Sequence, residues 1–367
     1  MLQPKQGRID GTHYLPTTPE TCLWGRLPNR DRPPVLRVAS GDTVTIDTLS
    51  HEGILEDQGR DPAAYLAGFG VPADRVLADA RDLAASGVRH DFDTDGPHVV
   101  TGPIEVAGAE PGDVLRVETL GLLVRAPYGF ISSRHGYGAL PGEFPETEPD
   151  TGPATVGGTR AYNSVCEFTE VIEEAGRLHG ILPYGDGRAA RFPLAPFLGL
   201  MGVATDTPDT LHSVPPGSFG GNLDINELQV GSSLYLPVQV PGASFYAGDP
   251  HYAQGDGEVA LTALEAPLRA TVRLTVIPHA EATTLLGVLG EPFAETATHW
   301  LPVGLHEDLD EALRRAVRAA VGFLSRTQGM PRHTALAYLS AAADFEISQV
   351  VDQIKGVHCL IRKTDFR

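Results

Sequence analysis

The stretch Ile104–Val124, IEVAGAEPGDVLRVETLGLLV, shows the pattern that runs through most of this 367-residue chain. Two short apolar segments, rich in β-branched side chains, flank the turn residues AGAEPGD. The stretch Val35–Ser50, VLRVASGDTVTIDTLS, repeats this arrangement around SGD. Apolar segments of about five to eight residues, separated by glycine and proline clusters, are typical of antiparallel sheets. We therefore expect a mainly β fold, with a jelly-roll-like β-sandwich core of antiparallel sheets.

Helical patterns interrupt the strands in two places. Asp61 precedes Pro62, and apolar residues then recur at helical spacing until Gly87, which predicts a helical insertion over about 61–87. Near the C-terminus an apolar stripe predicts an amphipathic helix that faces the core, followed by a second helix over Thr334–Ala343 and a short element over Phe345–Val351. The stripe consists of Leu309, Leu313, Val317, Val321 and Leu324.

The length of the chain favours two subdomains, because single cores usually stop growing below this size. The strand pattern breaks at TDTPDT, near residue 205. We therefore expect an N-terminal β-rich domain over 1–205, which includes the helical insertion. A second β domain is expected over 206–367, with the C-terminal helices and most of the candidate site residues.

Composition excludes several classes of partner and of catalyst. The formal net charge of −19 would repel nucleic acid and anionic membranes, so a small neutral or cationic substrate is expected. The first residues contain no apolar run of signal-peptide length, and the three cysteines are widely spaced, which together favour a cytoplasmic protein with structural thiols. The three lysines are Lys5, Lys355 and Lys363, all near the chain ends, so a lysine-assisted nucleophile is not expected.

Residues 216–258 concentrate polar and acidic side chains among glycines. Three pairs of such side chains are each separated by two positions, which on extended backbone places both members on one face. A mixed imidazole and carboxylate set suits zinc, manganese or iron better than magnesium. An acidic turn with a surface histidine is the alternative. The pairs are Asn222 with Asp224, Asp249 with His251, and Asp256 with Glu258.

Other residues in this chain have two possible roles each. The N–H groups of Gly220 and Gly221 are candidate oxyanion donors, although a turn or capping role is the alternative for this segment. His98 precedes a predicted strand and is a candidate substrate ligand or a structural hydrogen-bonding residue. His51 has acidic neighbours in the sequence. We expect His51 to lie in a solvated loop, and the alternative is that it belongs to a second set of metal ligands. Whether His51 or Cys166 joins the site is left open.

The segments GGNLD and LPVQVPGASFYAGDPHYAQGDGE resemble the acetamidase/formamidase family, which carries GGN-x-D, a strand ending in LPV, and GD-x-H-x-x-x-GDGE. The segments TGPIEVAGAEPGDVL and LSAAADFEISQVVD are also similar to this family. The resemblance implies a β-sandwich with added α/β elements, a metal-assisted site and a homo-oligomer. It also implies hydrolysis of short aliphatic amides to acid and ammonia. Asp224, Asp249, His251 and Glu258 match the family's motif positions.

Amide hydrolysis needs an activated nucleophile, a group that stabilises the oxyanion and a proton donor for the departing nitrogen. A divalent metal supplies the first two, and zinc is the expected ion, with calcium and manganese as alternatives. We expect Asp224, Asp249 and His251 to bind the metal. Glu258 is the expected general base and acid, and Asn222 the residue that holds the amide.

Two alternatives have different chemistry. A cupin-like metal oxygenase or isomerase would need a histidine at the position of Asp249. A non-catalytic ligand-binding β-sandwich would use the acidic loop for a structural Ca²⁺.

Overall fold

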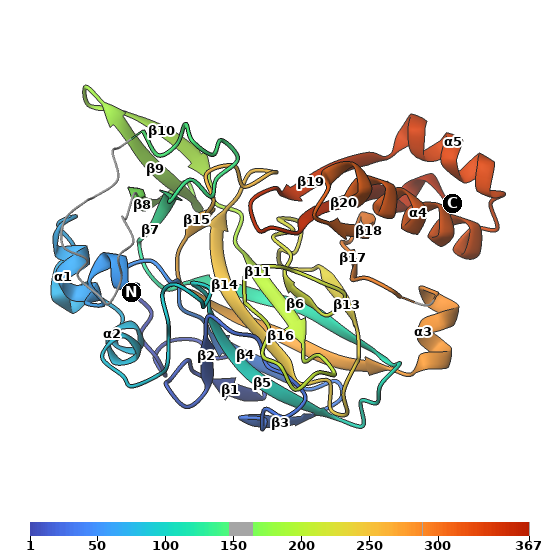
Figure 1. Cartoon of the computed structure of the whole chain (residues 1–367), viewed down its shortest axis with the longest axis horizontal. Coiled ribbons are helices and arrows are strands. Elements are labelled where there is room, and N and C mark those ends of the chain that lie inside the picture. Colours follow the sequence, from blue (N-terminus) through green and yellow to red (C-terminus); the bar gives the residue numbers. More distant parts are fainter. Residues whose placement is uncertain (147–163, 288, 367) are drawn as a thin grey trace.

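The computed structural model describes residues 1–146, 164–287 and 289–366, and these ranges are mainly β (Figure 1). Few helices are present, and most strand pairs are antiparallel. The predicted fold class is therefore confirmed. No helix in the described ranges has the length and apolar character needed to cross a lipid bilayer.

One sheet contains nine of the described strands. Its central strands come from both halves of the chain. In spatial order the strands are β1 (His13–Leu15), β4 (Thr43–Asp47), β16 (Leu268–Ile277), β6 (Val114–Val124), β13 (Ser233–Pro237), β17 (Phe293–Glu295), β18 (His299–His306), β20 (Lys355–Arg362) and β19 (Asp344–Gln349).

The other sheet contains eleven described strands and carries the candidate site. Its main path is β10 (Arg188–Pro193), β9 (Arg177–Gly185), β8 (Ser164–Glu174), β7 (Tyr128–Arg134), β15 (Leu264–Glu265), β14 (Phe245–Ala253), β11 (Phe197–Val203) and β12 (Gly220–Asn222). Beside it, β5 (Val99–Ala107) pairs with β14 and with β2 (Cys22–Trp24) and β3 (Leu36–Ala39). Strands β8 to β10 project from the body of the protein (Figure 1).

The stretch Ile104–Val124 joins the two sheets. It forms the end of β5 in one sheet, a turn, and all of β6 in the other. Gly112 in the turn has φ of +98°, a conformation that favours glycine. Val106 and Leu115, on either side of the turn, are completely buried in the core between the sheets. Each such side chain contributes about 1.5–3 kcal/mol by burial, so the apolar pattern is what drives the sheets together.

Within the range of about 61–87 predicted as helical, the structure has α1 (Pro62–Ala67), η2 (Ala73–Arg75) and α2 (Ala78–Ala84). The short helix η1 (Glu56–Gln58) precedes this range. The Asp61 carboxylate accepts hydrogen bonds from the N–H groups of Ala63 and Ala64 at 3.0 and 3.1 Å, which caps α1. The last helix ends at Ala84, before Gly87.

The C-terminal region contains α3 (His279–Leu285), α4 (Leu309–Thr327), α5 (Arg332–Ala342) and η3 (Lys363–Asp365). The predicted stripe on α4 is wrong at Leu313, which is 40% exposed. Ala312 and Ala316 face β18 instead, because a Cβ on Gly304 of β18 would lie only 2.3 Å from the Ala312 carbonyl oxygen. Small side chains are needed where the helix approaches the strand so closely.

The predicted boundary near residue 205 does not separate the two sheets. Strand β6 pairs with both β13 and β16, and β5 pairs with β14. Each sheet therefore takes strands from both sides of this position.

Candidate active site

The predicted site residues lie around β11, which pairs with β14 on one side and β12 on the other. Asp249 and His251 belong to β14, and Asn222 ends β12. Asp224, Asp249 and Glu258 have φ of +52°, +47° and +47°. Residues other than glycine adopt this conformation rarely, and such backbone is concentrated at functional sites. Asp224, Asp249, His251 and Glu258 are all buried, and each contributes to overlapping groups of side chains.

Gly199 of β11 leaves the space in which these side chains meet. A Cβ there would lie 2.4 Å from Asp224 Oδ1, 2.7 Å from His251 Cε1 and 2.9 Å from Asp249 Oδ2. Ordinary contacts of a Cβ are longer than 3.4 Å. The absence of a side chain at Gly199 therefore allows Asp224, which follows β12, to approach Asp249 and His251 of β14.

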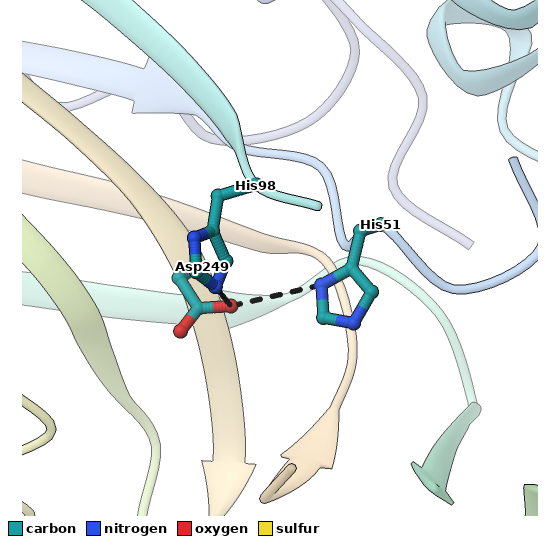
Figure 2. A group of neighbouring side chains, drawn as sticks. All are labelled: His51, His98 and Asp249. Atoms are coloured by element: carbon teal, nitrogen blue, oxygen red, sulfur yellow. Dashed lines mark ion pairs between the residues drawn. The ribbon is translucent and has the colours of Figure 1, made fainter. Parts of the chain in front are cut away.

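His51 and His98 converge on Asp249 from other parts of the chain (Figure 2). His51 Nδ1 lies 3.8 Å and His98 Nε2 lies 3.7 Å from Asp249 Oδ1. The expectation of a solvated loop at His51 is wrong, since this residue is 4% exposed. His51 lies four residues after the end of β4, in the interior of the protein. His98 Nδ1 lies 2.9 Å from Ser213 Oγ, so its other ring nitrogen faces the carboxylate.

Glu265 of β15 is a functional candidate that the sequence analysis missed. Its Oε2 lies 4.0 Å from His51 Nδ1, and its Oε1 lies 3.0 Å from His251 Nε2. Among the described residues, Glu265 Oε2 and Asp249 Oδ1 are both buried without a hydrogen-bond donor. An acidic residue inside the apolar segment ALTALEAPL was the one signal for it, because a buried carboxylate needs a partner.

Asp352 is the second missed residue. It lies beyond the end of β19, as the last residue of the family-like segment LSAAADFEISQVVD, which was the signal that could have found it. Its Oδ2 accepts a hydrogen bond of 3.0 Å from Asn222 Nδ2. Asp224, Glu258 and Asp352 form a further group whose oxygen atoms lie within 4.8 Å of one another.

The electrostatics of the cluster separate its carboxylates into two kinds. Burial, together with the neighbouring carboxylates, raises the pKa of Asp224 and of Glu258 well above the usual range. Burial raises the pKa of Asp352 to about 7. Burial would also raise the pKa of Asp249, but the charges of His251 and the other imidazoles outweigh it and lower the pKa. Asp249 therefore stays ionised, whereas its neighbours hold protons more strongly.

The imidazole rings of His98 and His251 also differ in the direction of their pKa shifts. Burial, aided by the nearby imidazoles, lowers the pKa of His98 to about 4, so this ring is neutral at pH 7. Burial would lower the pKa of His251 too, but the charges of Glu265 and Asp249 outweigh it and raise the pKa. His251 Nε2 lies 2.9 Å from Asp249 Oδ2. His251 is thus an ion-pair partner of the carboxylates, whereas His98 is a neutral ring whose Nε2 faces Asp249.

A cavity of about 370 Å³ opens onto this cluster. The strand residues on its wall all belong to the eleven-stranded sheet, and they are Arg134, Asn222, Asp249 and Glu265. Gly220 and Gly221 are not on this wall, and the Gly220 N–H donates to the carbonyl oxygen of Gly217. The structure therefore does not place these glycines as oxyanion donors. Seven residues of the cluster are among those that line the cavity: His51, His98, Asn222, Asp249, Glu258, Glu265 and Asp352.

Cys166 lies behind the cluster and not on the cavity wall. Its Sγ is 3.9 Å from Glu52 Oε2, and Arg134 Nη2 lies 2.8 Å from the same oxygen. Burial raises the pKa of the Cys166 thiol to about 11, so it is not a thiolate at neutral pH.

Comparison with known proteins shows which proteins this chain is similar to. Residues 203–362 match the model of the Acetamidase/Formamidase family. The chain is 31% identical over 210 residues to a formamidase of Methylophilus methylotrophus, and the match covers 48% of this chain and 50% of the relative. It is 28% identical over 226 residues to an acetamidase of Mycolicibacterium smegmatis, covering 48% of this chain and 52% of the relative. The chain thus spans about half the length of the curated relatives it matches.

The similarity of the fold extends further along the chain. The crystal structure of an acetamidase from Bacillus halodurans superimposes with a TM-score of 0.70, at 25% identity, over 96% of this chain and 98% of that one. The resemblance indicated by the sequence motifs is therefore confirmed, because residues 203–362 match the model of the Acetamidase/Formamidase family.

Proposed function

We propose that this protein hydrolyses short aliphatic amides to a carboxylate and ammonia. The observation that carries the proposal is the buried Asp249 Oδ1, which faces two imidazole nitrogens without a hydrogen-bond donor, at the end of a cavity that also exposes Glu258. The formamidase and acetamidase names of the relatives support the choice of substrate class.

The donor atoms around Asp249 fit a divalent cation. Separations of 3.7–4.0 Å to the ring nitrogens and between His51 and Glu265 are too long for hydrogen bonds. They are close to the distance of about 3.3 Å between two ligands of one tetrahedral zinc ion. We therefore assign His51, His98, Asp249 and Glu265 as the ligands, with zinc as the preferred ion. His251, which pairs with two of these carboxylates, orients them, a role that differs from its predicted one.

A zinc ion bound there would lower the pKa of a bound water to about 7 and would polarise the amide carbonyl. The raised pKa of Glu258 suits a group that accepts a proton from water and returns it to the departing nitrogen. Asn222 Nδ2 is held by Asp352, and Asn222 Oδ1 has no donor among the described residues. This oxygen is therefore free to accept a hydrogen bond from the amide nitrogen of a substrate. Asp224 lies next to Glu258 and Asp352 and supports these two carboxylates.

Location and assembly are part of the proposal. All three cysteines are free thiols, which is consistent with a reducing cytoplasm. Ile172 on β8 and Tyr184 on β9 are 38% and 57% exposed on the projecting strands, which is consistent with a homo-oligomer that covers them.

Ammonia release is the decisive assay. The purified protein is tested with formamide, acetamide and propionamide before chelation, after chelation, and after addition of Zn²⁺. We expect turnover that chelation abolishes and zinc restores, and we expect Asp249→Asn to lose both zinc and turnover. Asp206→Asn, a change at an exposed carboxylate, is the control.

Other outcomes identify the alternatives. Oxygen uptake with bound iron would indicate a cupin-like oxygenase. A calcium-dependent rise in melting temperature without turnover would indicate a binding protein. Ammonia release that chelation leaves unchanged would refute the metal-assisted mechanism.

A further inference from the structure

A second cluster of candidate ligands lies outside the cavity, against strands β19 and β20. It consists of Glu227, Glu346 and His358, which we call the His358 cluster. Glu346 and His358 are direct partners in the antiparallel pair of β19 and β20. Glu227 follows three residues after Asp224 in a turn that begins at Ile225. None of the three lines the 370 Å³ cavity.

His358 is oriented as a metal ligand would be. The residue is completely buried, and its Nδ1 lies 2.8 Å from Ser348 Oγ. With Nδ1 in that hydrogen bond, Nε2 faces the two carboxylates. A ring whose second nitrogen is held by a hydroxyl or carboxylate is the usual arrangement of a histidine ligand.

The carboxylates are near His358 but do not form hydrogen bonds with it. Nε2 lies 3.0 Å from Glu227 Oε2 and 3.5 Å from Glu346 Oε2. Nevertheless, among the described residues both His358 Nε2 and Glu227 Oε2 are buried atoms without a hydrogen-bond partner. A simple ion pair would align these groups, whereas ligands of a shared cation need not point at one another.

The charge around the cluster also favours a cation. Asp256 is held nearby by a hydrogen bond of 3.0 Å from Asn226 Nδ2, and Asn226 is the neighbour of Glu227. Two carboxylates therefore face the imidazole, and the carboxylate of Asp256 adds negative charge near Glu227. One nitrogen and two or three carboxylate oxygens form a ligand set that suits zinc.

We infer that the His358 cluster is a second divalent-cation site, for Zn²⁺, separate from the proposed catalytic one. A cation there would join the turn that contains Glu227 to the strand that contains Glu346. The same two segments carry Asp224 and Asp352 of the candidate active site, and Gln254 Nε2 also connects them through the carbonyl oxygens of Asp224 and Ser348. The second site is thus a structural clamp on one wall of the active site.

The test counts zinc equivalents on the full-length protein. The metal-free protein is titrated with Zn²⁺ and washed, and bound zinc is measured by mass spectrometry. We expect two equivalents on the wild type, one on Glu346→Gln, one on Asp249→Asn and none on the double variant. Glu295→Gln removes a comparable half-buried ion pair, with Lys363, and should keep two equivalents.

Stability provides an independent readout. In the Asp249→Asn background, zinc should still raise the midpoint of unfolding, and the added Glu346→Gln change should abolish this effect. His358→Gln serves as a second variant. If Glu346→Gln binds as much zinc as the wild type, the second site is refuted. If Asp249→Asn binds as much as the wild type while Glu346→Gln loses one equivalent, the second site stands and the proposed catalytic site is refuted.

Discussion

Replacing Gly199 by alanine tests whether the open space on β11 is what allows the active-site cluster to form. The added methyl group would lie 2.4 Å from Asp224 Oδ1, 2.7 Å from His251 Cε1 and 2.9 Å from Asp249 Oδ2. Three buried side chains block it at once, so at least one of them or the strand must move. Inserting a methyl group into a packed core costs about 1–3 kcal/mol of unfolding free energy.

The effect on activity should exceed the effect on stability. A displacement of about 1 Å at reacting groups lowers rates roughly 10²-fold. We therefore expect Gly199→Ala to fold with a modest loss of stability, to retain less zinc and to release ammonia about 100 times more slowly than the wild type.

The assay compares the wild type, Gly199→Ala and Gly87→Ala in parallel. Urea unfolding measures stability, mass spectrometry measures bound zinc, and ammonia release measures kcat/KM. Gly87→Ala is the matched control, because a Cβ at Gly87 would meet no atom within 4 Å. Wild-type zinc content and wild-type kcat/KM in a folded Gly199→Ala protein would refute the account of the cluster given above.

Three further changes test other parts of the structure. Glu258→Gln should retain zinc but lower the rate of ammonia release by about 10²–10⁴-fold, and an unchanged rate would exclude Glu258 as the base. Burial would raise the pKa of Asp95, but hydrogen bonds from the Asp91 N–H and the Arg26 side chain outweigh this effect and lower the pKa. The ionised Asp95 side chain therefore stabilises the fold at every pH above its unfolded pKa of about 3.9. Asp95→Asn should thus cost about 1 kcal/mol in urea unfolding at pH 7, and the difference should vanish as the pH falls below about 4, whereas a constant difference would contradict this. Gly304→Ala should destabilise the protein by about 1–3 kcal/mol without changing ammonia release, because its Cβ would lie 2.3 Å from the backbone of α4. An unfolding curve equal to that of the wild type would show that α4 does not pack so closely against β18.

Local features of the sequence were sufficient for much of the fold. The apolar segments around the turn in Ile104–Val124 predicted two strands, and both are present. Asp61 followed by Pro62 predicted a helix start, and the cap is formed. These predictions depend on neighbouring residues alone. Leu313 was predicted to face the core and is exposed instead, because Gly304 of β18 determines how closely α4 approaches the sheet and which face of the helix is buried.

For the site, the sequence alone determined which side chains of one strand share a face and which motifs they belong to. Asp249 and His251 are such a pair, because alternate residues of a strand point the same way. Tertiary structure alone decided that His51 and His98 meet at Asp249, and that Glu265 lies next to His51 and His251. They arrive from separate segments, brought together by the order of strands in the sheet, and the missing side chain at Gly199 lets Asp224 approach Asp249 and His251. Periodicity along a chain fixes the direction of a side chain, but only the packing of distant strands fixes what it faces.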